Sequence, residues 1–148
     1  EGRLSSESKL EIRGMLREVT EIESIGDSCY NLARTINRKR SGGNDFTEKQ
    51  YEHIHQMMQL TDDALAQMIA IVEDDYHVVD VNKTFNLENE INNYRAQLKN
   101  QNVVDVNNKE YDYQMGVHYM DLIGECEKLA DYVVNVVEAR TNVKEKKA

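Results

Sequence analysis

The sequence has no proline, no tryptophan and only seven glycines among its 148 residues. Because proline and glycine are the residues that most readily interrupt helices, their scarcity predicts long, unbroken helices. No apolar run approaches the length of a membrane-spanning segment, and no signal peptide is evident. A content of 40% hydrophobic and 30% charged residues is typical of a soluble helical protein, and the length favours a single domain with its own core.

Cysteine and basic residues are also scarce. Cys29 and Cys126 are too few and too far apart for a disulfide framework, which favours a reducing compartment, and both occupy apolar helical positions where we expect burial. With 18 basic and 27 acidic residues, the chain has a net charge of −9 and lacks the basic face that nucleic-acid binding requires. Nucleic acid is therefore excluded as a partner. No Ser or Cys nucleophile has a credible base, and no glycine loop could cradle a phosphate, so we predict that the chain is not an enzyme.

The most informative feature of the sequence is a short motif, E-x-E-x-x-x-D-x-x-x-N, that occurs twice. A shift of 104 residues superimposes residues 21–31 on residues 125–135. Between Leu10 and Asn37 the identities under this shift are all polar, whereas the apolar residues agree only in class. The identical pairs are Glu21/Glu125, Glu23/Glu127, Asp27/Asp131 and Asn31/Asn135. A helix shaped by packing alone would vary in its polar residues, so these repeated polar residues need a separate explanation.

The repeated carboxylates suggest a cation site. On a helix, residues four apart lie nearly above one another, so Glu23 and Asp27 form one stripe, with each Glu on the flank of its helix and each Asp further toward water. Two carboxylates at this spacing repel each other by roughly a few tenths of a kcal/mol. A bound cation would offset that repulsion: carboxylate and amide oxygens suit Mg²⁺ and Ca²⁺, and carboxylates also bind iron and zinc. The other interpretation is a solvated stripe on an acidic protein.

The spacing of apolar residues, alternately three and four apart, predicts four helices and no strand. Their expected bounds are 6–40, 47–75, 80–101 and 108–141, with a turn over 103–107. Thr47 with Gln50, and Asn107 with Glu110, are capping-box pairs that we expect to open the second and fourth helices. Because the connections are short, the predicted fold class is all-α, an antiparallel up-down four-helix bundle.

Each predicted helix has an apolar seam that should face the core. In the first helix the seam is Met15, Val19, Ile22, Gly26, Cys29, Ala33 and Ile36. In the second it is Ile54, Met57 or Met58, Thr61, Leu65, Met68 and Val72, and in the third it is Leu87, Ile91, Tyr94 and Leu98. In the fourth it is Tyr119, Leu122, Cys126, Leu129, Val133 and Val136. Gly26 and Ala130, the small residues before each motif Asp, are expected to allow close helix approach.

The segment Glu21 to Asn31 resembles the E-R-I-G-D-x-x-x-N signature of the PhoU family of phosphate-transport regulators. Ser24 stands where the family has Arg, and the second copy has Lys-Leu-Ala where the family favours Arg-Ile-Gly. The resemblance implies a PhoU-like bundle made of three-helix repeats. Residues 6–40 would be the motif helix of a truncated first repeat, and residues 47–141 a complete second repeat.

The resemblance also implies that the motif carboxylates bind metal, commonly iron or zinc. Its expected ligands are Glu23, Asp27, Glu127 and Asp131, with Asn31 and Asn135 as supporting polar groups. The second pair is the better candidate, because its repeat is complete and neighbouring helices can supply further oxygens.

PhoU-like domains occur as free cytosolic regulators and as the cytoplasmic C-terminal part of sodium/phosphate cotransporters. The lack of an initiator methionine, and a motif so near the start, favour the second arrangement. The chain would then be a regulatory domain tethered to the inner face of the membrane by an upstream transmembrane region. Its partner would be the transporter domain of the same polypeptide, or a phosphate-transport or signalling protein.

A third interpretation is a purely structural bundle that oligomerises without metal. The first helix lacks the two helices that would complete its repeat, so apolar surface such as Leu16, Ile25 and Leu32 would be left uncovered. Large exposed apolar patches are usually buried by a partner, and we therefore predict a homodimer.

Overall fold

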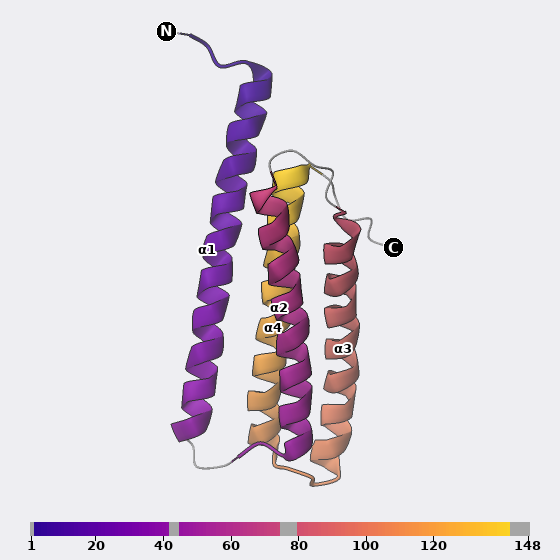
Figure 1. Cartoon of the computed structure of the whole chain (residues 1–148). Coiled ribbons are helices and arrows are strands. Elements are labelled where there is room, and N and C mark those ends of the chain that lie inside the picture. The colour runs from indigo at the N-terminus through magenta and orange to yellow at the C-terminus, as the bar shows by residue number, and fades with distance from the viewer. Residues whose placement is uncertain (1, 42–44, 75–79, 143–148) are drawn as a thin grey trace.

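The computed structural model describes residues 2–41, 45–74 and 80–142. These residues form four α-helices and no strand: α1 (Ser6–Ser41), α2 (Glu48–Glu73), α3 (Asn82–Asn107) and α4 (Tyr113–Thr141). Successive helices run in opposite directions, which gives an up-down arrangement (Figure 1). The all-α class predicted from the sequence is confirmed for this part of the chain.

Helix α4 is the centre of the structure. It packs against each of the other three helices, and α2 and α3 also pack against each other. Helix α1 touches α4 but neither α2 nor α3, and its N-terminal turns project beyond the end of the bundle (Figure 1). The molecule is therefore a three-helix bundle, α2 to α4, with a fourth helix lying along one member.

The predicted seams of the three-helix bundle form its core. Every seam residue predicted for the fourth helix is at most 2% exposed. In α2, Ile54, Met57, Thr61 and Met68 are buried, and in α3 the buried seam residues are Ile91 and Leu98. Leu65, Val72, Leu87 and Tyr94 are partly buried against this core. The apolar periodicity thus identified the inward faces of these three helices correctly.

The predicted seam of the first helix, by contrast, faces solvent. Met15, Val19, Ile22 and Ile36 are between 40% and 65% exposed, and Gly26, Cys29 and Ala33 are also exposed. We call these seven residues the α1 stripe. The prediction that they pack in the core of the chain is wrong, as is the expected burial of Cys29.

A mostly polar side of α1 packs against α4 instead. Ile25 is 8% exposed and Leu32 is partly buried, so of the three apolar residues expected to be uncovered Leu16 alone is exposed. The reason lies in α4, whose apolar faces are already covered by α2 and α3. The polar α4 residues Glu125, Asn135 and Glu138 are left for α1. Helix α1 meets them with Ser28, Glu21 and Arg17, while Ile25 joins the apolar core.

The boundary between α3 and α4 also differs from the prediction. Helix α3 continues to Asn107 through the residues expected to form a turn, and the Asn107/Glu110 pair caps no helix. The chain turns at Lys109, whose φ is 60°. Asp112 is the actual N-cap of α4, because its side chain accepts a hydrogen bond from the Met115 amide.

The opening of α2 is as expected, since Thr47 and Gln50 form a reciprocal capping box. The predicted end of this helix, near residue 75, lies outside the described residues. The structure describes α2 as far as Glu73.

Close helix approach occurs at Gly116 rather than at Gly26. A Cβ on Gly116 would lie 2.9 Å from Val106 Cγ2 and 3.0 Å from Asn102 Oδ1, and that oxygen already accepts a hydrogen bond from the Tyr111 hydroxyl. Gly26 is exposed, with nothing within 4 Å of a built Cβ, so its predicted packing role is wrong. Ala130, its counterpart in the second motif, is fully buried.

The two glycines give a matched test of this packing. Gly116→Ala should destabilise the fold by about 1–3 kcal/mol, because a methyl group is forced against α3. Gly26→Ala should stabilise it by about 0.5–1 kcal/mol, because alanine replaces glycine in an exposed helix interior. Urea unfolding followed by circular dichroism measures both, and a gain in stability for Gly116→Ala would contradict the packing described.

Candidate functional site

The two copies of the motif face each other across the contact between α1 and α4. The helices are antiparallel, and the level of residue 21 on α1 corresponds to that of residue 135 on α4, while residue 31 corresponds to residue 125. The side of α1 that carries Glu21, Ser28 and Asn31 lies against α4. The Glu and Asn residues at the ends of each motif copy thus lie at the contact between α1 and α4.

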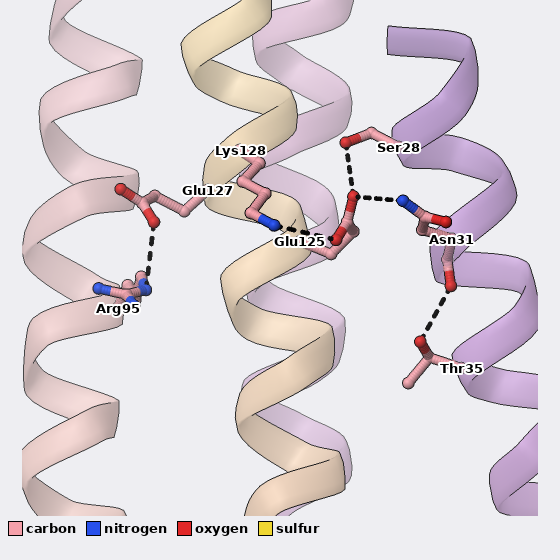
Figure 2. Close-up of polar contacts among 7 residues, drawn as sticks. All are labelled: Ser28, Asn31, Thr35, Arg95, Glu125, Glu127 and Lys128. Atoms are coloured by element: carbon pink, nitrogen blue, oxygen red, sulfur yellow. Dashed lines mark hydrogen bonds and ion pairs between the residues drawn. The ribbon is translucent and has the colours of Figure 1, made fainter. Parts of the chain in front are cut away.

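The first and last residues of each motif copy bond to the other copy. Asn135 Nδ2 donates a hydrogen bond to Glu21 Oε2 over 3.1 Å, and Asn31 Nδ2 donates to Glu125 Oε1 over 3.4 Å. Figure 2 shows the second of these bonds. Since Glu21 matches Glu125 and Asn31 matches Asn135 under the 104-residue shift, the two bonds are equivalent. This reciprocal Glu–Asn pairing explains two of the four repeated identities without a metal.

Glu125 is the most heavily bonded residue of the pairing. Its Oε1 also accepts a hydrogen bond of 2.7 Å from Ser28 Oγ, and its Oε2 lies 4.0 Å from Lys128 Nζ (Figure 2). Ser28 is buried, with 2% of its surface exposed, and the Glu125 side chain is 14% exposed. A carboxylate with so little access to water depends on these partners for its solvation.

Ion pairs extend the same seam toward the C-terminus of α4. Arg17 Nη2 lies 3.4 Å from Glu138 Oε2, and Arg140 Nη1 lies 4.0 Å from Glu18 Oε2. The Arg140 side chain also donates to the carbonyl oxygen of Val72, which connects this end of the seam to α2. Together these contacts fix one register of α1 along α4.

The predicted metal ligands of the first motif lie away from this seam. Glu23 and Asp27 are both exposed, in agreement with the expectation that these carboxylates are on the surface. In the second motif Glu127 and Asp131 are less exposed than their counterparts in the first, because α3 packs against α4. Arg95 of α3 places its Nε 3.2 Å from Glu127 Oε2 (Figure 2).

This arrangement does not fit a multi-ligand metal centre. Across residues 2–41, 45–74 and 80–142, no three His, Cys, Asp or Glu side chains come together where they could hold an ion. Arg95 also places a positive charge where a cation would bind Glu127. Metal ligation by Glu23, Asp27, Glu127 and Asp131 stays a prediction, and at the second pair it requires Arg95 to move.

A polar pocket that the motif search missed lies at the end of the bundle near residues 47 and 111. It has a volume of about 250 Å³ and is bordered by His53 of α2, Tyr119 of α4 and Asp105 of α3. His53 Nδ1 lies 2.9 Å from the Tyr119 hydroxyl. Burial, with a contribution from nearby Lys49, lowers the pKa of His53, and burial raises the pKa of Tyr119. One residue could have indicated this pocket from the sequence. Tyr119 occupies a predicted core position, and a buried tyrosine needs a polar partner for its hydroxyl.

The match to known protein families covers the three-helix bundle. The family model described as PhoU domain matches residues 54–139, from within α2 to near the end of α4. The chain belongs to the PhoU domain family. Helix α1 lies outside the matched PhoU segment. Neither the curated proteins nor the solved structures gave a match. None of the helices in the described part of this PhoU domain is long and apolar enough to cross a membrane.

The reciprocal pairing can be tested at Ser28. Ser28→Ala removes the shortest hydrogen bond to the poorly solvated Glu125 carboxylate, so it should lower the free energy of unfolding by about 1–3 kcal/mol. Ser24→Ala is the matched control: Ser24 donates a hydrogen bond to the Thr20 carbonyl of its own helix, and we expect a change within about 0.5 kcal/mol. Urea unfolding measures both, and hydrogen exchange should show the loss of protection concentrated in α1. Equal effects of the two substitutions would contradict the pairing.

The metal prediction can be tested by removing Arg95. If Glu127 and Asp131 are ligands, Arg95→Gln should bind divalent cations several-fold more tightly than the native chain, because a competing positive charge is gone. Adding Asp131→Asn to this variant should reverse the gain in affinity. Arg13→Gln is the control for the change in net charge, because Arg13 is an exposed residue of α1. Calorimetric titration with Fe²⁺, Zn²⁺, Mg²⁺ and Ca²⁺ measures the affinities. The same result for all variants would leave the carboxylates as a solvated stripe.

Proposed function

We propose that this PhoU domain is an accessory, regulatory part of a phosphate-transport system. The observation that carries the proposal is the family match over residues 54–139, together with the motif Glu21 to Asn31. PhoU domains are regulatory rather than enzymatic, so the role proposed is control of transport and not a reaction.

The proposed mode of action is contact with protein. The chain has a net charge of −9, and the motif carboxylates Glu23 and Asp27 are exposed, so its surface repels phosphate ions. A docking partner would instead act on the contact between α1 and α4. Among the described residues, helix α1 packs against α4 and no other helix, through a side rich in hydrogen bonds and ion pairs. It is therefore the element that a partner can shift with the least disturbance of the core.

The arrangement we propose is a domain of a sodium/phosphate cotransporter, on the cytoplasmic side of the membrane and tethered by a transmembrane region of the same polypeptide. A free-standing regulator with the same fold is the alternative. The two are separated by the size and location of the polypeptide in cells. A band well above 17.2 kDa that stays with carbonate-washed membranes supports the cotransporter. A soluble band near 17.2 kDa supports the free regulator.

A structural role without metal is the second candidate function. It is favoured by the pairing of Glu21 with Asn135, Glu125 with Asn31 and Glu127 with Arg95, because these contacts occupy repeated motif residues within the protein itself. In this case the motif serves to join the two repeats. The titration of the Arg95→Gln variant distinguishes the two roles.

The regulatory proposal is tested by phosphate uptake in the native host. Deleting the coding region of this domain should leave uptake of labelled phosphate high when external phosphate is plentiful, whereas the parent strain reduces it. Sulfate uptake should be unchanged in both strains, and a strain carrying Arg13→Gln, an exposed position outside the motif and the matched segment, should behave as the parent. Identical phosphate uptake in the deletion and parent strains, under both limiting and plentiful phosphate, would overturn the proposal.

A further inference from the structure

Gln50 of α2 carries a buried hydrogen-bond donor without a partner. The residue is 2% exposed, and its Oε1 accepts a hydrogen bond of 3.0 Å from the Thr47 amide in the capping box. That bond fixes the orientation of the side-chain amide, because exchanging its oxygen and nitrogen would break the box. The Nε2 group is then left over, and no described residue accepts its hydrogens. Buried donors are nearly always paired, so this one marks a place where an acceptor is missing.

The polar pocket at the end of the bundle is bordered by Gln50 and supplies further donors. His53 and Tyr119 share one hydrogen bond within it. Burial lowers the pKa of His53, so its ring is neutral at pH 7, and the pair then holds two hydrogens of which the shared bond uses one. Whichever tautomer is present, one N–H or O–H group is left as a donor. The exposed Lys49 adds a positive charge.

Two carboxylates border the same pocket, those of Asp105 and Glu110. Burial raises the pKa values of Tyr111 and Tyr119, and the negative charge of Asp105 adds to both effects, so this carboxylate lies near both rings. With Lys49 as the one cation among the described residues that border the pocket, negative charge exceeds positive charge by one. A simple anion such as phosphate is therefore disfavoured, although the donors require an acceptor.

We propose that this pocket binds a small zwitterion, a free amino acid. Its carboxylate would accept hydrogen bonds from Gln50 Nε2 and from the His53–Tyr119 pair, and its ammonium group would lie against Asp105 and Glu110. A volume of about 250 Å³ is smaller than the about 300–1,000 Å³ of pockets for drug-sized ligands, which limits the ligand to a small molecule. The proposal goes beyond the regulatory function above and does not depend on it.

Binding requires Tyr111 to move. The Gln50 side chain lies near the Tyr111 hydroxyl and opposes the rise in its pKa, yet the two groups are not hydrogen-bonded. The hydroxyl donates to Asn102 Oδ1 over 2.7 Å. Because Tyr111 belongs to the turn between α3 and α4 and is only partly buried, its ring can swing outward without unpacking a helix. The ligand carboxylate would then take the place beside the Gln50 amide.

Ligand-observed NMR on the full chain, with the common amino acids tested one by one, identifies a binder, and calorimetric titration gives its affinity. Acetate, methylamine and inorganic phosphate serve as probes with a single kind of charge. We expect one or more amino acids to bind at least tenfold more tightly than each of these probes, because a zwitterion alone uses both ends of the pocket. Changes in backbone amide shifts should be concentrated in residues 47–53 and 101–111.

Two variants each remove one end of the proposed site. Gln50→Glu keeps the capping box, in which Glu serves as well as Gln, but replaces the amide donor by a carboxylate oxygen, so affinity for the amino acid should fall at least tenfold. Asp105→Asn removes one charged partner of the ammonium group and should weaken binding several-fold. Asp62→Asn is the matched control for charge, because Asp62 is exposed on α2 and does not border the pocket. Circular dichroism and the unfolding midpoint check that each variant is folded.

Three results would overturn the proposal. The first is a native chain that binds no amino acid. The second is acetate, methylamine or phosphate binding as tightly as the best amino acid, which would show a site for a single charge. The third is unchanged affinity in both folded variants, or shift changes outside the pocket, which would place the binding elsewhere. If a variant fails to fold, the shift changes of the native chain decide the location.

Discussion

The burial of α4 is the constraint on which the rest of the structure depends. Its apolar side chains are almost completely inaccessible, and each such side chain stabilises a fold by about 1.5–3 kcal/mol. Helices α2 and α3 supply much of that cover. Helix α1 meets α4 with a mostly polar side, to which Ile25 adds an apolar contact with the core, and its own apolar stripe is turned outward. The position of one helix thus decides the orientation of another.

The contact between α1 and α4 changes the interpretation of the repeated motif. Its outer residues, Glu and Asn, form reciprocal pairs across the contact between α1 and α4. The inner residues have diverged in their surroundings, since Glu23 is exposed whereas Glu127 is paired with Arg95. Identical residues in the two copies therefore do not perform identical tasks. The outer motif residues join α1 to α4, and a cation site at Glu127 would be an additional feature that needs rearrangement of Arg95.

Much of the fold could be predicted from the sequence, because apolar spacing reports which side of a helix avoids water. The seams of α2, α3 and α4 and the Thr47 capping box followed from local rules. The orientation of α1 could not be predicted in this way, since spacing identifies an apolar face but not whether the chain contains a partner for it. The last turn of α3 was missed because Val106 is held by its packing near Gly116, a tertiary contact with no local signal. The Glu–Asn pairing was visible as a repeat, but only the antiparallel contact of α1 with α4 showed that the copies bond to each other.

The crossed bonds between the copies also have a consequence for how this protein can change over evolutionary time. Here a substitution at Glu21 removes the acceptor used by Asn135, and one at Glu125 removes the acceptor used by Asn31. Each copy of the motif thus restricts which substitutions the other can accept at these positions. Residue 24 bonds within its own helix and is free of this restriction, and the residue 104 positions later, Lys128, is of a different type.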